Sequence, residues 1–240
     1  MKEEQLIQQA VSYIHAFFFA AKVNKKKWYR EIKDNDDLFY AFFVLRRRMI
    51  QPKNYVIHEA AGLYEKNIKP EVWRDYQSLK NALTQKGDLK KFHTENSKII
   101  YPIDGLLEEY NINHLHLDRS RYQVFFMVEG NDIFMINICK HFERNRTSYS
   151  KNSLLDIVAK NWPGKKERKY GRTDKNRLTE KYASAYAWEK VSQFHEWLQS
   201  AAISVDDITE YELAFTDDHT FIFREVGSKS IMPTALPFEA

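Results

Sequence analysis

The amino-acid sequence predicts an α+β fold, with a helical N-terminal region packed on a small central antiparallel sheet and with a C-terminal helix and hairpin. Apolar residues recur at helical spacing through most of the first 90 residues. Two apolar runs between residues 124 and 138 flank a tight-turn pair, which indicates paired strands. A further helical pattern then precedes two strand-like runs near the C-terminus.

Three amphipathic helices are expected in the N-terminal region. Residues 6–21 place their apolar side chains on one broad face. Residues 38–49 repeat the pattern, with arginines at 46–48. The third helix begins at Pro70, because proline is favoured at the first helical position, and Gly87 is suited to ending it.

The centre of the sheet is predicted at residues 124–128 and 133–138. Both runs are apolar on both faces, whereas an edge or surface strand would alternate with polar residues. Gly130 and Asn131 lie between them and suit a tight turn. We therefore expect an antiparallel hairpin in the middle of the sheet, and finding either run helical would contradict the fold class.

The C-terminal part contains two further helical patterns and a second hairpin. Residues 153–156 have the spacing of a capping box, so a short helix is expected to begin there and to end before Asn161. Another helix is expected over residues 186–198. The runs 211–215 and 220–224 form the predicted terminal hairpin.

These elements divide the chain into three regions, or form one continuous domain. Residues 1–90 are the helical region, residues 91–163 an α+β core with the central hairpin, and residues 164–240 a basic segment, a helix and the terminal hairpin. A chain of 240 residues is long enough to bury a hydrophobic core in either arrangement.

The composition excludes several classes of protein. With 16 Phe, 14 Tyr and 5 Trp, the chain is too aromatic to be wholly disordered. The single cysteine, Cys139, cannot form an internal disulfide or a cysteine-based zinc site, which favours a reducing, cytoplasmic location. No run approaches the roughly 20 apolar residues that span a bilayer, and the acidic start at residues 1–4 is unlike a secretory signal.

Residues 163–177 form a basic segment with seven Lys or Arg and two acidic residues, a net charge of +5 against +4 for the whole chain. We expect it to be exposed and largely irregular. Phosphate contacts and aromatic stacking commonly hold single-stranded nucleic acid, and a plain solvated loop is the alternative. Cations and aromatics also occur together at residues 22–30. The predicted RNA contacts are Lys165, Lys166, Arg168, Lys169, Tyr170 and Arg172.

His114 and His116 alternate with leucines in a short predicted strand, so they are expected to share one face. His141 follows the second central strand. Histidine titrates near neutral pH, so it can take a proton from a ribose 2′-hydroxyl or give one to a leaving oxygen. Arg119 and Arg121 lie just beyond the strand, where guanidinium groups can stabilise charge on a reacting phosphate. These five residues are the candidate catalytic set.

Two other interpretations of the histidines remain open. His114, His116 and Asp118 offer imidazole and carboxylate ligands of the kind that transition metals prefer, which would suit a metal-dependent phosphodiesterase. Alternatively, the histidines bond to backbone at a strand edge and have only a structural role. In the acid–base interpretation no metal is needed, and Asp118 would orient His116.

Several catalytic motifs are absent from the sequence. It contains no phosphate-binding Gly-x-x-x-x-Gly-Lys loop, no Gly-x-Ser-x-Gly elbow, no Cys-x-x-Cys and no His-Glu-x-x-His. These absences disfavour nucleotide hydrolysis, serine-hydrolase chemistry and thiol redox chemistry. Cys139 lies inside an apolar strand, where we expect it to pack as a small hydrophobic residue.

The stretch from Phe92 to Pro163, under a third of the chain, resembles a bacterial family of mostly uncharacterised proteins associated with mobile or defence loci. The resemblance implies no established activity. The residues that carry it are Asp104–Leu107, Tyr110–Leu117 with its His-Leu-His-Leu core, Val124–Phe126, Ile136–Ile138, His141, Leu154–Val158 and Asn161–Pro163.

The order of the predicted elements also resembles that of RelE-like ribonuclease toxins. These are small folds with a helical N-terminus and a central antiparallel sheet, whose catalytic basic and histidine residues lie at strand ends. Such toxins cut RNA without a metal. The chain is about twice as long as that fold needs, and the similarity is one of layout.

The leading hypothesis from the sequence is a metal-independent endoribonuclease of toxin or phage-defence type, with RNA as partner and no cofactor. A toxin of this kind would also bind an inhibitor protein, its antitoxin. The alternatives are the metal-dependent phosphodiesterase and a non-catalytic module that binds protein or nucleic acid. RNA cleavage with and without a chelator would distinguish the three.

Overall fold

A computed structural model of the protein describes residues 2–23, 32–50, 53–63, 68–93, 104–118, 121–140, 150–165, 172–173, 183–204, 211–215 and 221–225. The chain forms two compact units. The helical unit combines the residues up to Arg47 with those from Thr173 onward, and the sheet unit contains most of the residues between Arg48 and Arg172. The predicted boundaries at residues 90 and 163 both fall inside the sheet unit. No described helix is sufficiently long and apolar to cross a membrane.

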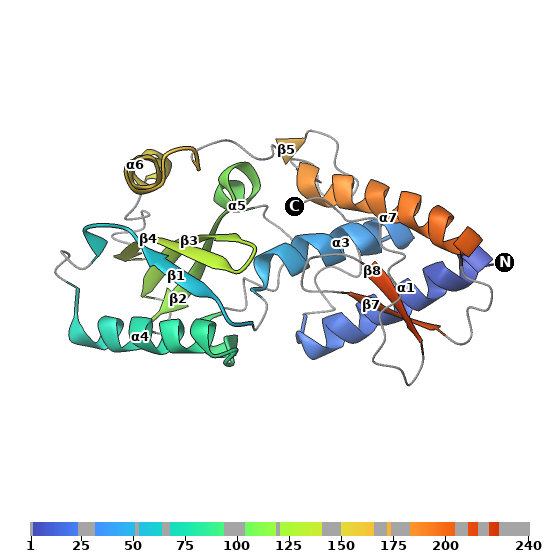
Figure 1. Ribbon diagram of the computed structural model, residues 1–240, viewed down its shortest axis with the longest axis horizontal. Coiled ribbons are helices and arrows are strands. Elements are labelled where there is room, and N and C mark those ends of the chain that lie inside the picture. Colours follow the sequence, from blue (N-terminus) through green and yellow to red (C-terminus); the bar gives the residue numbers. More distant parts are fainter. Residues whose placement is uncertain are drawn as a thin grey trace. The chain divides into compact units, whose positions relative to one another are not determined.

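The sheet unit is built around four strands (Figure 1). They are β1 (Val56–Glu59), β2 (Ile112–Leu117), β3 (Tyr122–Glu129) and β4 (Asp132–Lys140), in the order β1-β4-β3-β2. β3 and β4 pair antiparallel at the centre, which confirms the predicted hairpin and the α+β class. Gly130 supplies the positive φ, 58°, that the first central residue of a type II′ turn requires.

Strand β1 makes the sheet mixed, whereas the sequence predicted an antiparallel sheet. It pairs parallel to β4, with Ile57 opposite Ile133. The N–H of Val56 donates to the carbonyl of Asn131 (2.9 Å), and the N–H of Ala60 donates to that of Met135 (2.9 Å). Four residues are too few for a clear alternating pattern, so this strand was missed within a region predicted to be helical.

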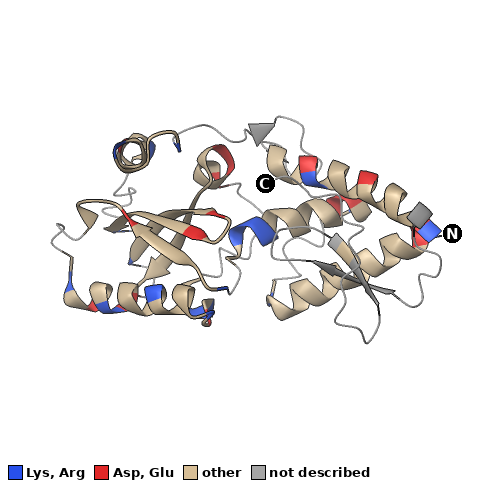
Figure 2. Cartoon of the chain, in the orientation of Figure 1, with Lys and Arg blue, Asp and Glu red and all other residues tan. Residues whose placement is uncertain are grey.

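Helix α4 (Pro70–Thr84) covers one face of the sheet, and the short helix η2 (Lys90–Phe92) follows it (Figure 1). Pro70 stands in the first turn, as predicted. Basic and acidic side chains alternate along α4 (Figure 2). The buried side of α4 and the facing side of the sheet form one core, which includes Val72, Tyr76, Leu79, Leu83, Leu115, Leu117, Val124, Phe126, Ile133 and Met135.

The chain turns away from α4 at Gly87, which lies very close to the backbone of Ala82. The positive φ that ends the helix belongs to Lys86 (54°), and the N–H of Gly87 donates to the carbonyl of Ala82 at 2.7 Å. A Cβ at Gly87 would lie 2.9 Å from the Cα of Ala82. The glycine expected to stop the helix therefore provides space for the chain to fold back.

Tyr76 links α4 to the end of β1, and its replacement by phenylalanine is expected to destabilise the protein. Its buried hydroxyl donates to Oε1 of Glu59 at 2.5 Å, and Nζ of Lys80 lies 3.0 Å from the same oxygen. Hydrogen bonds to charged groups contribute about 1.5–3 kcal/mol. Tyr76→Phe should lower the free energy of unfolding by about that amount in urea titrations, whereas Glu59→Gln, which keeps the acceptor oxygen, should cost less. Equal stabilities of Tyr76→Phe and the parent protein would contradict this.

Helices α5 (Gly105–Tyr110) and α6 (Lys151–Asn161) lie on the other face of the sheet (Figure 1). The sequence placed the start of α6 at Ser153, but the N-cap is Ser150, and Ser153 is the third helical residue of the same capping box. At the other end, Oδ1 of Asn161 accepts the N–H of Ala61 at 2.7 Å, which ties α6 to the loop after β1. The core on this face consists of Ile112, Phe125, Met127, Phe134, Ile136, Leu154, Leu155 and Val158.

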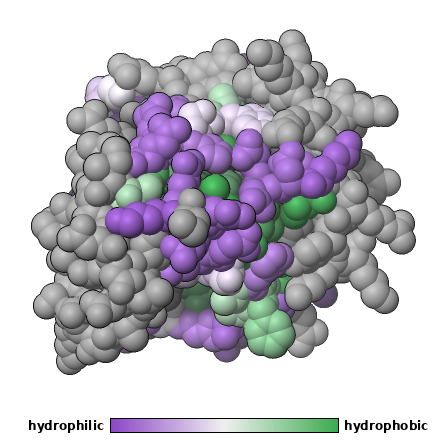
Figure 3. Space-filling view, turned by 90° about the vertical axis from the view of Figure 1, so that its right-hand side faces the viewer, coloured by the Kyte–Doolittle hydropathy of each residue, from purple (hydrophilic) through white to green (hydrophobic). Residues whose placement is uncertain are grey.

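The helical unit contains α1 (Lys2–Ala20), α3 (Asn35–Arg48), α7 (Ala185–Ser204) and the antiparallel hairpin of β7 (Tyr211–Phe215) and β8 (Phe221–Glu225). These elements match the predicted first two helices, the C-terminal helix and the terminal hairpin. Two short strands, β5 (Arg172–Thr173) and β6 (Ala183–Ser184), form a separate pair. Described side chains at the α1 and α7 end are mostly hydrophilic, with hydrophobic ones between them (Figure 3).

Aromatic contacts hold the helices of this unit together. The rings of Phe39 and Phe194 meet edge to face with centroids 4.7 Å apart, and those of Phe17 and Phe42 do so at 5.2 Å. Such pairs stabilise by about 0.5–1.5 kcal/mol beyond the area that they bury.

Candidate active site

The two histidines predicted to be catalytic lie side by side on β2. Their neighbours Leu115 and Leu117 point into the core beneath α4, so His114 and His116 occupy the opposite face, as the alternation predicted. Their ring centroids are 5.3 Å apart, with the planes at 70°. The side chain of His114 is 28% exposed, whereas His116 is 8% exposed. The pair thus combines one solvent-reached ring with one nearly buried ring.

Asp104 provides a carboxylate that contacts His114. It is the N-cap of α5, and its Oδ1 accepts the N–H groups of Leu106 (3.1 Å) and Leu107 (3.3 Å). Its other oxygen, Oδ2, lies 3.3 Å from Nδ1 of His114. Because the cap fixes the carboxylate, Asp104 holds the ring of His114 through Nδ1 and leaves Nε2 outside this contact.

The charge state of Asp104 reflects these contacts. Burial acts to raise the pKa of its carboxyl, but the hydrogen bond and charge of His114 oppose this, with smaller contributions from Arg48 and the N–H of Leu107. Together they hold the pKa of Asp104 below its ordinary value of 3.8. Asp104 is therefore an anion throughout the neutral range.

Asp118 does not take the place that the sequence predicted for it. Its φ of 45° ends the extended run, so the alternation that aligns the histidines stops there. Its N–H donates to Oδ2 of Asp75 (2.9 Å), and its own Oδ2 lies 3.9 Å from a guanidinium nitrogen of Arg121, whose side chain is 71% exposed. Within the described ranges, no three His, Cys, Asp or Glu side chains are grouped so as to hold a metal ion.

A row of polar side chains continues from the histidines across the sheet. Gln123 on β3 pairs with His116 on one side and with Cys139 on the other. Asn137 lies next to this row on β4, and its Nδ2 donates to Sγ of Cys139 at 3.1 Å. Gln123 and Asn137 are both buried. Cys139 therefore packs beside polar groups as well as apolar ones.

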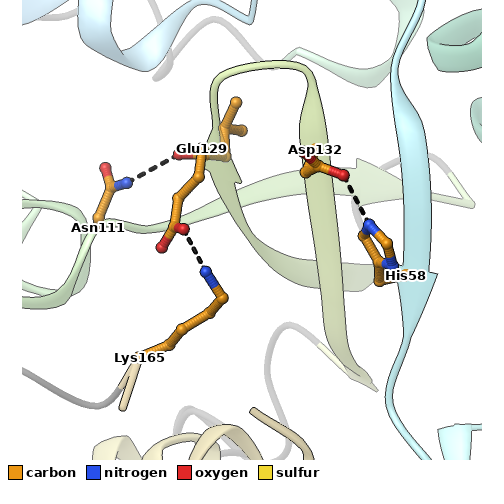
Figure 4. A network of polar contacts seen from close by, with 6 residues as sticks. His58, Asn111, Glu129, Asp132 and Lys165 are labelled. Carbon is orange, nitrogen blue, oxygen red and sulfur yellow. Dashed lines mark hydrogen bonds and ion pairs between the residues drawn. The ribbon is translucent and has the colours of Figure 1, made fainter. Parts of the chain in front are cut away.

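Lys165 is the residue of the predicted RNA segment whose side chain the structure describes. Its ammonium contacts the carboxylate of Glu129 (Figure 4). The same ammonium lies 4.4 Å from the centroid of the Phe134 ring. It is half-buried, whereas the sequence predicted an exposed segment. On the other side of the β3–β4 turn, Nε2 of His58 lies 2.7 Å from Oδ1 of Asp132. Lys165 therefore helps to hold the β3–β4 turn.

Several predicted site residues lie outside the described part of the chain. These are Arg119, His141, Lys166, Arg168, Lys169 and Tyr170, and for Arg172 only its position in β5 is described. Asp104 has no predicted role of its own from the sequence patterns. The signal was present, because an aspartate directly before Gly105, Leu106 and Leu107 suits the N-cap of a short helix.

The described site thus offers a carboxylate-held imidazole beside a second imidazole, an arrangement suited to general acid–base chemistry. Comparison of the chain with protein-family models, with curated protein sequences and with solved structures found no match.

Proposed function

We propose that this protein is a metal-independent endoribonuclease of toxin or phage-defence type. The observation that carries the proposal is the array of Asp104, His114 and His116, in which a capped carboxylate contacts one ring and a second ring lies 5.3 Å from the first. Carboxylate-oriented histidines are a recurrent device for proton transfer. An inhibitor protein and a cytoplasmic location belong to the same proposal.

The proposed reaction is an internal transfer of the RNA phosphodiester. One histidine takes the proton of the 2′-hydroxyl, whose oxygen then bonds to the adjacent phosphorus. The bond from phosphorus to the 5′-oxygen breaks, and the other histidine gives that oxygen a proton. The products are a 2′,3′-cyclic phosphate and a 5′-hydroxyl. Arg119 and Arg121 would stabilise the charge on the phosphate oxygens.

Cleavage of a labelled single-stranded RNA with and without EDTA tests this proposal. Cleavage at equal rates in both conditions, with cyclic phosphate ends, is the expected result. Loss of cleavage in EDTA would favour the metal-dependent phosphodiesterase instead. Absence of cleavage in both, across several RNAs, would overturn the enzymatic proposal and leave a binding module.

The basic segment is expected to bind RNA through the residues beyond Lys165. For single strands, each phosphate contact changes the slope of log K, the RNA-binding constant, against log salt concentration by about 0.7. Replacing Lys166, Arg168 and Lys169 by Ala removes three such contacts and should flatten this slope by about 2. Lys165→Ala is the matched control, because its ammonium already contacts Glu129. Filter binding over a salt series measures both. Equal slopes in the triple variant and the parent would show that the segment does not contact RNA.

A further inference from the structure

Gln123 is a buried polar residue that the proposed reaction does not yet use. It lies on β3 directly opposite His116 of β2, and the side chains of paired residues project from the same face of a sheet. Gln123 is 4% exposed, and its Oε1 accepts no hydrogen bond from any described residue. An unsatisfied buried carbonyl costs about 1–3 kcal/mol, so an apolar residue would be more stable here.

The described residues paired with Gln123 differ in their ability to donate to this oxygen. Its two cross-strand neighbours are His116 and Cys139, and a thiol is only a weak donor. One N–H of the Asn137 amide donates to Sγ of Cys139 at 3.1 Å, and Asn137 is paired with Phe125 rather than with Gln123. His116 is the directly paired residue with a strong donor, the N–H of its ring.

We propose that Gln123 is a positioning residue whose Oε1 accepts the ring N–H of His116, so that the other ring nitrogen faces the substrate as a proton acceptor. This deepens the proposed ribonuclease function and rests on it for its kinetic consequence. The two histidines then have different partners, a carboxylate at His114 and a neutral amide at His116. His116 acts as the base toward the 2′-hydroxyl, and His114 acts as the acid toward the 5′-oxygen.

The test uses Gln123→Met, which keeps the length of the side chain and removes the carbonyl. Nitrogen-15 NMR of the histidine rings, at a pH where His116 is neutral, should show one tautomer in the parent protein and a mixture in the variant. The kcat for RNA cleavage should fall by about 10- to 100-fold, less than the roughly 10²–10⁴-fold that a general base contributes, with KM nearly unchanged. The melting temperature should stay equal or rise, because an unsatisfied oxygen is removed.

Two further variants separate positioning from a structural role. Gln123→Glu keeps an acceptor oxygen at the same reach and should preserve the single tautomer of His116. Cys139→Ala changes the opposite neighbour of Gln123 and should leave both tautomer and kcat as in the parent. If Gln123→Met fails to fold, Gln123→Leu on the same measurements replaces it.

The outcomes also separate this inference from the proposed function. An unchanged His116 tautomer in a folded Gln123→Met protein overturns the positioning role, whatever the RNA assay shows. A tautomer change in a protein that cleaves no RNA supports the contact between Gln123 and His116 and overturns the ribonuclease proposal. A fall in melting temperature with an unchanged tautomer would assign Gln123 to packing alone.

Discussion

His116→Ala is expected to lower the single-turnover rate of RNA cleavage by about 10²–10⁴-fold, the usual contribution of one general acid or base. The ring lies 5.3 Å from that of His114 on the same strand face, so the variant would keep only one ring of the proposed proton-transfer pair. RNA affinity should change little, because phosphate contacts supply most of the binding of RNA.

His116 is buried, so a purely structural role of its ring is the alternative to catalysis, and the same variant tests both. With 8% exposure, the ring also fills space on the sheet, so the variant is expected to melt at a lower temperature. A destabilised variant that cleaves at the parent rate per folded molecule would rule out the catalytic role. His58→Ala is the matched control, because His58 pairs with Asp132 on a different strand and should retain full cleavage.

Asp104→Asn is expected to lower RNA cleavage by about 10²-fold or more while leaving α5 folded. The amide oxygen can still cap the helix, but the carboxylate that contacts Nδ1 of His114 is lost. Loss of an orienting carboxylate costs up to about 10⁴-fold in a serine-protease triad, because the ring is held in the wrong tautomer. Asp104→Ala should show the same loss of rate and a further loss of stability of about 1 kcal/mol from the missing cap.

The same carboxyl predicts a dependence of stability on pH. The folded-state pKa of Asp104 lies below its ordinary value of 3.8, so the folded protein favours the anion more than the unfolded chain does. This stabilisation is present above the ordinary value and is lost as the pH falls through the folded pKa. Urea titrations should show that the gap between the parent protein and Asp104→Asn closes in acid. A constant gap down to the acid limit of folding would show that the charge contributes nothing.

The local pattern of the sequence determined most of the elements. The central hairpin followed from two runs that are apolar on both faces around Gly130, and α4 followed from Pro70 and its apolar spacing. The face shared by His114 and His116 followed from strand alternation alone. Each of these inferences depends on residues close together in the chain, where spacing and backbone geometry decide the result.

Tertiary structure decided the residues that complete the sheet and the site. β1 exists because its four residues pair with β4, which lies more than seventy residues along the chain. Asp118 is next to the histidine strand in sequence, yet its positive φ turns it away, and the capping of α5 brings Asp104 to His114 instead. Lys165 belongs to a basic run in the sequence, but its ammonium pairs with the carboxylate of Glu129 and lies over the ring of Phe134 at the β3–β4 turn. Local periodicity sets which way a side chain faces within its own element, whereas its partner depends on how distant segments pack.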